Sequence, residues 1–284
     1  MRCRSTVAGY ALWVCRECRL EFLDPQPDDA ALSAIYSDGY FLGSQDPDTA
    51  ARRSGMKRAT GVMYIDALSS HVRPAATELL EIGCGQGELL VEARNRGYAV
   101  AGVEVSAHAA AVANRRLGAA LVEVGSIDTV TLPAGHFGAV LAADVIEHLR
   151  DPKGFLMRVR ELLLPGGMVV LITPSLDSWT RRLMRRHWME YKVEHLFYFT
   201  AMAIRLMLEQ CGFDEIRVSP NRKVLTIDYL WRHFERFRVP LLSSVIGLVR
   251  RAVPARLANR HLRLSASGLL AIARKPPVDS AART

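Results

Sequence analysis

The stretch Leu80–Gly87, LEIGCGQG, decides the fold of this chain. The residues before it, 77–82, form a short β run, and residues 88–96 form a helical stretch that Gly97 ends. Glycines at such a junction let the backbone turn tightly and approach a ligand with no Cβ in the way. The helix that follows has unpaired N–H groups in its first turn. The stretch therefore predicts a ligand-binding loop between a strand and a helix.

Strands and helices alternate from this loop onward. The strands are apolar nearly throughout, which is typical of a parallel sheet with helices on both faces. We therefore predict a doubly wound, mostly parallel α/β sheet that binds its ligand at the carboxyl ends of the strands. The expected strands are 77–82, 98–105, 120–124, 136–143 and 168–173, the expected helices 88–96, 107–117 and 154–164, and two further strands are expected at 213–218 and 267–273.

Acidic residues around the loop narrow the choice of ligand. A dinucleotide loop reads G-x-G-x-x-G and holds a pyrophosphate, whereas this loop reads G-x-G-x-G and is followed by Glu88. Glu88 and Glu81 would repel a pyrophosphate, so a cofactor with a cationic, amino-acid-bearing portion fits better. Glu104 closes the next strand, 21 residues after Gly83, where an acid can accept both hydroxyls of a ribose.

Two motifs together carry a family resemblance. The segments EIGCGQG at 81–87 and VIEHLRDP at 145–152 resemble hallmarks of the class I S-adenosylmethionine (SAM) dependent methyltransferases, in particular the small-molecule branch. The resemblance covers residues 76–218. It implies a Rossmann-like fold, SAM as the cofactor, and methyl transfer to an oxygen or carbon of a small-molecule acceptor.

The resemblance also assigns cofactor contacts to individual positions. Ser126 stands where the family often has an aspartate that accepts from the adenine amino group, and Phe137-Gly138 stands where it often has Phe-Asp. The resemblance implies that the methionine part of SAM is bound by Glu81, Gly83, Cys84, Gly85 and Gly87, and the ribose by Glu104. The adenine would contact Val105, Ser126 and Ile127. The underside of the cofactor would rest on Asp144 and Val145, and an N-terminal lid that carries Tyr40 would close over it.

Two histidines are candidates for the catalytic base. An oxygen or carbon acceptor has to lose a proton, and histidine suits that task at neutral pH. His148 follows the fourth strand, and His195 lies in a segment, 191–199, that resembles the family's His-Leu-x-x-Phe region. We predict His195 as the base and His148 as the alternative, with a purely structural role open for each.

The N-terminal cysteines predict no metal site. Cys15 and Cys18 resemble the second half of a zinc knuckle, but a structural zinc site needs four ligands and only Cys3 lies upstream. We interpret residues 1–28 as a degenerate knuckle. Five cysteines are an odd number, and the chain is too long to need disulfides, which favours a reducing, cytoplasmic compartment. The short apolar stretch 7–14 has no signal-peptide cleavage site.

Charge divides the chain into two unlike parts. The first 175 residues carry 17 Lys/Arg and 20 Asp/Glu, whereas the remainder carries 20 and 9. We expect a helical lid at 29–70, the SAM-binding domain at 71–220, and a basic helical insertion with a final strand at 221–284. The basic amphipathic pattern of 239–264 either packs on the core or makes peripheral membrane contact.

Other functions compete with small-molecule methyl transfer. The basic C-terminal part motivates an RNA methyltransferase, but the sequence has no recognisable RNA-binding motif, so nucleic acid is not the expected partner. A non-catalytic SAM-binding protein is the third reading. An NAD oxidoreductase is the weakest, because the loop departs from the dinucleotide pattern.

Overall fold

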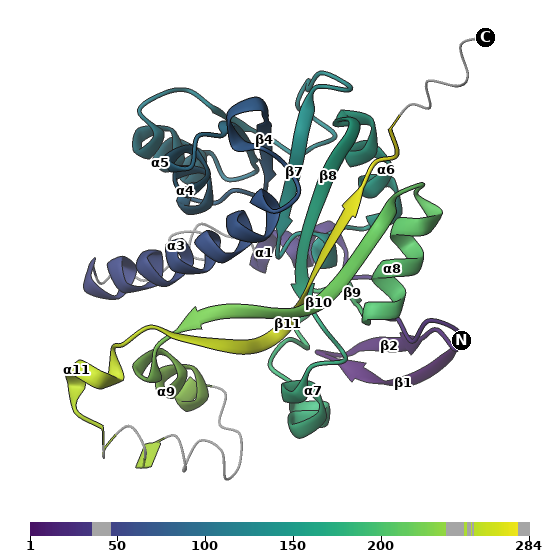
Figure 1. Cartoon of the computed structure of the whole chain (residues 1–284). Coiled ribbons are helices and arrows are strands. Elements are labelled where there is room, and N and C mark those ends of the chain that lie inside the picture. The colour runs from purple at the N-terminus through teal and green to yellow at the C-terminus, as the bar shows by residue number, and fades with distance from the viewer. Residues whose placement is uncertain (36–46, 237–246, 249–250, 252, 278–284) are drawn as a thin grey trace.

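A seven-stranded mixed sheet forms the centre of the protein (Figure 1). The structure, a computed structural model, describes residues 1–35, 47–236, 247–248, 251 and 253–277. The strand order is β10-β11-β8-β7-β4-β5-β6, and the five strands of this sheet that come first in the chain run parallel. These strands are β4 (Glu78–Ile82), β5 (Ala99–Glu104), β6 (Val122–Val124), β7 (Phe137–Ala143) and β8 (Leu163–Pro174). The predicted mostly parallel sheet is confirmed.

The position of β4 determines where a ligand can bind. From β4 the chain moves outward through β5 to β6 and then returns to β7 on the other side of β4. The connections that leave β4 and β7 therefore diverge at the carboxyl ends of these strands. Ligands of doubly wound sheets bind at such a switch point. The glycine turn at 83–87 lies there.

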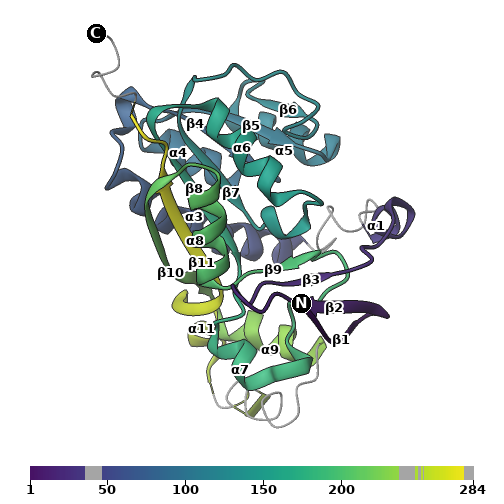
Figure 2. The same ribbon diagram turned by 90° about the vertical axis from the view of Figure 1, so that its right-hand side faces the viewer.

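Helices cover both faces of the sheet (Figure 2). Apolar side chains of α3 (Pro47–Ser69), α4 (Glu88–Asn95) and α5 (Ala107–Leu117) form one buried cluster with the sheet. Those of α6 (Pro152–Leu162) and α8 (Ala201–Gln210) form another. Because the strands between them are apolar on both sides, the sheet has two buried faces, as the sequence predicts.

Local capping sets the ends of these helices close to the expected positions. The side chains of Ser106, Asp151 and Thr200 accept hydrogen bonds from the backbone N–H three residues later, at 3.3, 2.9 and 3.0 Å. Such N-caps satisfy one of the unpaired N–H groups of the first turn. Gly118 ends α5 in the left-handed conformation, with φ of 66°, which costs glycine no Cβ clash.

The N-terminal segment forms a second, smaller sheet with the order β1-β2-β3-β9. Its strands are β1 (Arg2–Val7), β2 (Tyr10–Val14), β3 (Glu21–Leu23) and β9 (Phe197–Tyr198). The pairing of β3 with β9 joins this segment to the chain between β8 and the helix at 201–210. Leu12, Leu23 and Trp188 are buried together in its core. The first 28 residues are thus packed against the chain around residue 190.

A long hairpin closes the other edge of the central sheet. β10 (Asp214–Leu225) and β11 (Leu262–Arg274) pair antiparallel, and β11 adds antiparallel to β8. Both strands are longer than the predicted 213–218 and 267–273, because the hairpin continues past the sheet. Its outer part carries α9 (Ile227–Arg236) and α11 (Ala255–Ala258) within the expected insertion.

Shorter elements complete the described chain. They are α1 (Asp29–Ile35), α7 (Trp179–Met184) and the 3-10 turns η1 (Pro74–Ala76), η2 (Ile146–His148) and η3 (Arg185–His187). Tyr40, predicted to close over the cofactor, lies outside the described residues, as do residues 239–246, 249–250 and 252 of the basic stretch 239–264. Among the helices that the structure describes, none combines the length and apolarity needed to cross a bilayer.

Candidate active site

Three glycines shape the turn between β4 and α4. Gly83, Gly85 and Gly87 have φ of 71°, 54° and 77°, in the left-handed region that disfavours side chains. A Cβ on Gly83 would lie 2.6 Å from Cγ2 of Val145, so glycine is required for the turn to pack on the end of β7. A Cβ on Gly85 would meet no atom within 4 Å. The turn thus packs at one end and is open at Gly85, where a ligand can approach the backbone.

Glu104 links this turn to the end of β5. Its carboxylate accepts hydrogen bonds from the backbone N–H of Gly85 at 2.8 Å and of Ser106 at 2.9 Å. The side chain is buried, yet each carboxylate oxygen has a second lone pair to offer. The predicted neighbours, the glycine turn and the acid of the next strand, therefore converge. Val105, the next residue, is 62% exposed and provides an apolar surface beside them.

A cavity of about 620 Å³ opens beside the glycine turn. One part of its wall is Gly83, Cys84 and Gly85 with Asp144, all predicted from the sequence. The opposite wall comes from α3, β10 and α9, and includes Lys57, Tyr64, Lys223 and Arg232. Lys192, from the loop before β9, also lines the cavity. Glu104, Val105, Ser126 and Ile127 do not line this cavity, so the residues predicted for the adenosine half lie beyond it.

Two buried acids, Glu81 and Glu88, line the cavity near the turn. Glu81 is 5% exposed, and its Oε2 has no hydrogen-bond partner. Burial, reinforced by the charge of Glu88, raises the pKa of Glu81 well above its usual value. Glu88 pairs with Arg116 at 2.8 Å, and although burial opposes it, Lys57 and Arg116 hold the pKa of Glu88 below its usual value. At this end of the cavity, Glu88 is therefore charged, whereas Glu81 favours its protonated form.

Cys84 belongs to the glycine turn that lines the cavity. Its side chain is buried behind the turn. Burial and the nearby Glu81 and Glu104 raise the pKa of the thiol. Since the thiolate is the nucleophilic form of cysteine, Cys84 is not set up for nucleophilic chemistry.

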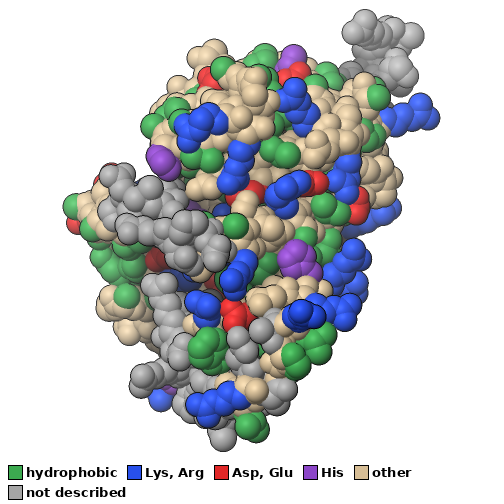
Figure 3. Space-filling view, turned by 90° about the vertical axis from the view of Figure 1, so that its left-hand side faces the viewer, with side chains coloured by type: hydrophobic (Ala, Val, Ile, Leu, Met, Phe, Trp, Pro, Cys, Tyr) green, Lys and Arg blue, Asp and Glu red, His purple; other side chains and the backbone are tan. Residues whose placement is uncertain are grey.

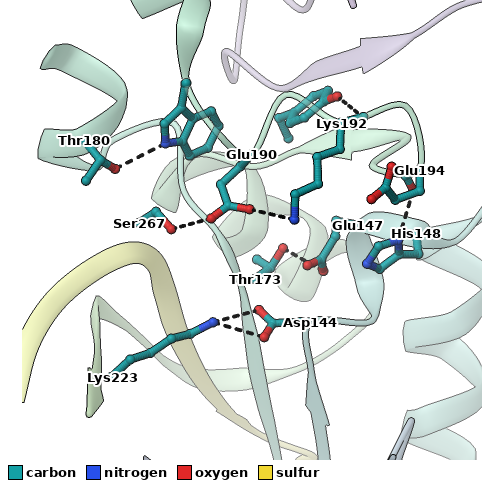
Figure 4. Close-up of polar contacts among 12 residues, drawn as sticks. Asp144, Glu147, His148, Thr173, Thr180, Glu190, Lys192, Glu194, Lys223 and Ser267 are labelled. Atoms are coloured by element: carbon teal, nitrogen blue, oxygen red, sulfur yellow. Dashed lines mark hydrogen bonds and ion pairs between the residues drawn. The ribbon is translucent and has the colours of Figure 1, made fainter. Parts of the chain in front are cut away.

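Asp144 stands at the end of β7 and faces Lys223, which no sequence motif marks. Its φ of 55° is in the left-handed region, which aspartate tolerates better than most residues. Lys223 of β10 lies 3.1 Å from its Oδ2, and the two are drawn in Figure 4. Partial desolvation opposes the charged form, but the ammonium of Lys223 holds the pKa of Asp144 below its usual value.

Two further residues of this wall, Thr60 and Tyr64, are likewise marked by no sequence motif. Tyr64 of α3 accepts a hydrogen bond from Asn221 of β10 at 2.9 Å, and burial raises its pKa to about 12. Thr60 accepts one from the backbone N–H of Val224 at 2.9 Å. These contacts join segments about 160 positions apart in the chain, and no local pattern in either segment marks them.

His148 and His195 lie together, although 46 residues separate them in the sequence. Their rings are 4.7 Å apart and nearly perpendicular. Burial lowers the pKa of both, more strongly for His195, so both rings are neutral at pH 7. Neither ring lines the cavity. Their predicted role as base stays a prediction, and the structure adds Glu147 as a buried third member of the group.

The remaining predicted contacts fall on the adenosine side. Ser126 caps the turn that follows β6, where its Oγ accepts from the backbone N–H of Asp128 at 3.3 Å. Ile127 is buried in the core, so its side chain packs against the sheet. Val145 is half-buried behind Gly83. Among these residues, the backbone after β6 and the exposed Val105 offer the accessible surface.

Sequence and structure comparisons agree with this geometry. A family model described as a methyltransferase domain matches residues 49–218, more than half of the chain. The nocamycin O-methyltransferase of Saccharothrix syringae is 32% identical over 146 residues, 45% of this chain and 52% of that protein. A tRNA U34 carboxymethyltransferase of Trichlorobacter lovleyi is 30% identical over 166 residues, 55% of this chain and 51% of that protein. The chain thus spans about half the length of these curated relatives.

Solved structures share the fold. A SAM-dependent methyltransferase from Archaeoglobus fulgidus superposes with a TM-score of 0.54 at 17% identity, covering 87% of this chain and all of that one. One from Thermotoga maritima, described as a possible histamine N-methyltransferase, gives 0.52 at 18% identity over 78% and 91% of the two chains. With the matching family model, the glycine turn and the converging Glu104, these likenesses place the chain in the class I SAM-dependent methyltransferase family.

Proposed function

We propose that this methyltransferase transfers the methyl group of SAM to an oxygen or carbon of a small-molecule acceptor. The observation that carries the proposal is the cavity of about 620 Å³ between the glycine turn and the Asp144–Lys223 wall. Its volume is that of a small-molecule pocket. The methionine end of the cofactor would occupy the turn side, and the rest of the space would hold the acceptor.

The residues at the turn fit SAM. Gly85 leaves its backbone open, and Glu104 presents a carboxylate for the two ribose hydroxyls. Oε2 of Glu81 has no hydrogen-bond partner and can accept a hydrogen bond from the amino group of SAM. Lys57 lines the cavity and supplies a positive charge for the carboxylate of SAM. When bound, SAM supplies an electrophilic methyl group, so the chain mainly has to orient the acceptor and exclude water.

The acceptor side offers charged groups on three elements. Asp144 at the end of β7, Lys223 of β10 and Lys192 from the loop before β9 line the cavity. Asp144 is charged and faces the cavity, so it can orient an acceptor hydroxyl through a hydrogen bond. Neither His148 nor His195 lines the cavity. Neither ring therefore contacts an acceptor hydroxyl directly, and a proton could reach them only through intervening groups of the wall.

Transfer of a deuterated methyl group tests the proposal. The whole chain is incubated with methyl-deuterated SAM and a small-molecule extract, and labelled products are found by mass spectrometry. We expect labelled low-molecular-weight products that disappear with Glu104→Ala and decrease with Asp144→Asn. Asp214→Asn, an exposed aspartate at the start of β10 and outside the cavity, is the matched control. Binding of S-adenosylhomocysteine without any labelled product of low molecular weight would contradict the proposal.

A nucleic-acid acceptor is the second candidate. Basic side chains of α3 and α9, namely Arg52, Arg53, Lys57 and Arg232, line the cavity, and Figure 3 shows Lys and Arg spread over one face of the molecule. The similar Trichlorobacter protein is named as acting on a tRNA. Label in the RNA fraction, together with retention on RNA that falls steeply with salt, would favour this acceptor over a small molecule.

A further inference from the structure

Three side chains of metal-ligating types, two buried and one half-buried, lie together behind the cavity wall. Glu147 and His148 belong to η2, and His195 lies on the loop before β9. One ligand atom of each lies within 4.8 Å of the other two. Figure 4 shows Glu147 and His148 side by side, near Asp144. The backbone supports this meeting, because the N–H of Leu196 donates to the carbonyl of Glu147 at 2.8 Å.

Neighbouring groups orient each side chain. The hydroxyl of Thr173 donates to Oε2 of Glu147 at 2.9 Å, while Oε1 is buried and has no hydrogen-bond partner. Nδ1 of His148 lies 3.0 Å from the carbonyl oxygen of Glu194. A carbonyl only accepts, so Nδ1 carries the hydrogen and Nε2 the lone pair of the neutral ring. Histidines that bind metals are commonly held by such a bond on their other nitrogen.

His195 supplies the second independent sign of a ligand. It is 4% exposed, and its Nδ1 is buried with no hydrogen-bond partner in the described structure. A buried polar atom without a partner costs free energy. Two such atoms, Nδ1 of His195 and Oε1 of Glu147, belong to the same three-residue group. A single bound cation would satisfy both.

The charges around the group are unevenly matched. Asp144 pairs with Lys223 at 3.1 Å, and Glu190 pairs with Lys192 at 3.5 Å. Glu147 forms no ion pair with any residue in the described ranges, although it is only 1% exposed. Buried charges are normally paired or coordinate metals. Glu147 is therefore a buried carboxyl group that has no ion-pair partner among the described residues.

We propose that Glu147, His148 and His195 bind one divalent transition-metal ion, such as Zn²⁺, Co²⁺ or Mn²⁺. Two imidazoles and one carboxylate suit these ions better than Mg²⁺ or Ca²⁺, which prefer oxygen ligands. Three protein ligands leave at least one coordination position open. Ligand atoms of a tetrahedral zinc ion lie about 3.3 Å apart, since its bonds are about 2.0 Å long. Side-chain rotation has to close the 4.8 Å spacing by up to about 1.5 Å.

The proposal changes the predicted roles of both histidines. The sequence predicts no metal here and favours His195 or His148 as the base, but a metal ion would occupy the lone pair that a base needs. The ion would also tie the turn after β7 to the segment that pairs with the N-terminal sheet. The proposal does not depend on the identity of the methyl acceptor, because metal binding is measured without turnover.

Cobalt titration of the whole chain tests the site. The protein is stripped with a chelator, and Co²⁺ binding is followed by visible absorption and calorimetry, with Zn²⁺, Mn²⁺ and Mg²⁺ as competitors. We expect one Co²⁺ per chain, displaced by Zn²⁺ but not by Mg²⁺. Glu147→Gln and His195→Gln should weaken binding by about 100-fold or more, since loss of an outer contact alone costs 10–100-fold. His136→Gln, an exposed histidine paired with Glu78, should have no effect.

The alternative site at the N-terminal cysteines is removed by a second variant. Cys15→Ser/Cys18→Ser should bind Co²⁺ as wild type does, and the complex should lack thiolate charge-transfer bands. If the histidine and glutamate variants do not fold, this double variant still decides the proposal. Absence of Co²⁺ binding, or binding that the double cysteine variant abolishes, would overturn it. Displacement by Mg²⁺ at equal concentration would overturn the assignment to a transition metal.

Discussion

Replacing Glu104 with alanine probes the point where two separate elements meet. Glu104 closes β5, and its carboxylate holds the backbone N–H groups of Gly85 and Ser106 at 2.8 and 2.9 Å. The proposed ribose site uses the remaining lone pairs of the same two oxygens. The substitution therefore acts on the free protein through the backbone contacts, and on the cofactor through the ribose contacts.

The two effects have different sizes. A hydrogen bond to a charged group contributes about 1.5–3 kcal/mol, so losing two ribose hydroxyls costs about 3–6 kcal/mol. Since about 1.4 kcal/mol is tenfold in affinity, we expect S-adenosylhomocysteine to bind about 10² to 10⁴ times more weakly. The backbone N–H groups of Gly85 and Ser106 become accessible to water, so the unfolding free energy should fall by only about 1–3 kcal/mol.

Calorimetry with two ligands separates these effects. Methylthioadenosine and its 2′-deoxy form are titrated into wild type and Glu104→Ala, which makes a double-mutant cycle. Removing the hydroxyl should weaken binding to wild type and leave binding to the variant nearly unchanged. Glu123→Ala, an exposed acid on β6, is the control. The ribose assignment is refuted if Glu104→Ala binds S-adenosylhomocysteine within threefold of wild type.

Three further perturbations test the packing and charges of the site. Gly83→Ala places a Cβ 2.6 Å from Cγ2 of Val145 at a φ of 71°, so we expect the unfolding free energy to fall by about 1–3 kcal/mol in denaturant titrations; unchanged stability would contradict the tight packing. The pKa of Glu81 is raised in the folded state, so wild type loses stability as pH rises above the usual carboxyl pKa. The melting temperature of Glu81→Gln should therefore exceed that of wild type by more at pH 8 than at pH 5, and a constant difference would argue against the buried proton. Lys223→Met removes the ammonium 3.1 Å from Asp144, so the pKa of that carboxyl should rise in carboxyl-carbon NMR titrations, and an unmoved pKa would show that other groups hold the charge.

Much of the central fold could be predicted because its signals are local. The expected helix 107–117 coincides with α5, and the predicted parallel strands lie within two residues of the observed starts, apart from β8. β8 begins at Leu163, because the chain after α6 pairs with β7 before the Pro165-Gly166-Gly167 turn ends. Apolar runs and glycine stops identify such elements without any knowledge of their partners.

The outer parts of the fold were less predictable. Residues 1–28 looked like an isolated cysteine segment, yet β3 pairs with β9, and Glu21 accepts a hydrogen bond from Tyr191 at 2.6 Å. The hairpin of β10 and β11 is longer than the expected strands, since its outer part pairs only with itself. Each feature depends on a partner more than 35 residues away in the chain.

The candidate site divides in the same way. The glycine turn and Glu104 could be identified because parallel strands end at one edge of a sheet. Lys223, Tyr64 and Asn221 could not, because no periodicity marks a residue that meets the cavity from the end of a hairpin or the side of a helix. His148 and His195 were chosen individually, and their contact was not expected.

The sequence by itself determined the parallel sheet, the glycine turn and the acid that closes the next strand, because backbone sterics and hydrophobic periodicity act over a few residues. Only the tertiary structure decided which charges line the cavity, that both histidines lie behind its wall, and that Glu147 joins them. These facts depend on how distant segments pack, and packing is set by the sum of many weak contacts across the whole chain. No single stretch of residues encodes that sum.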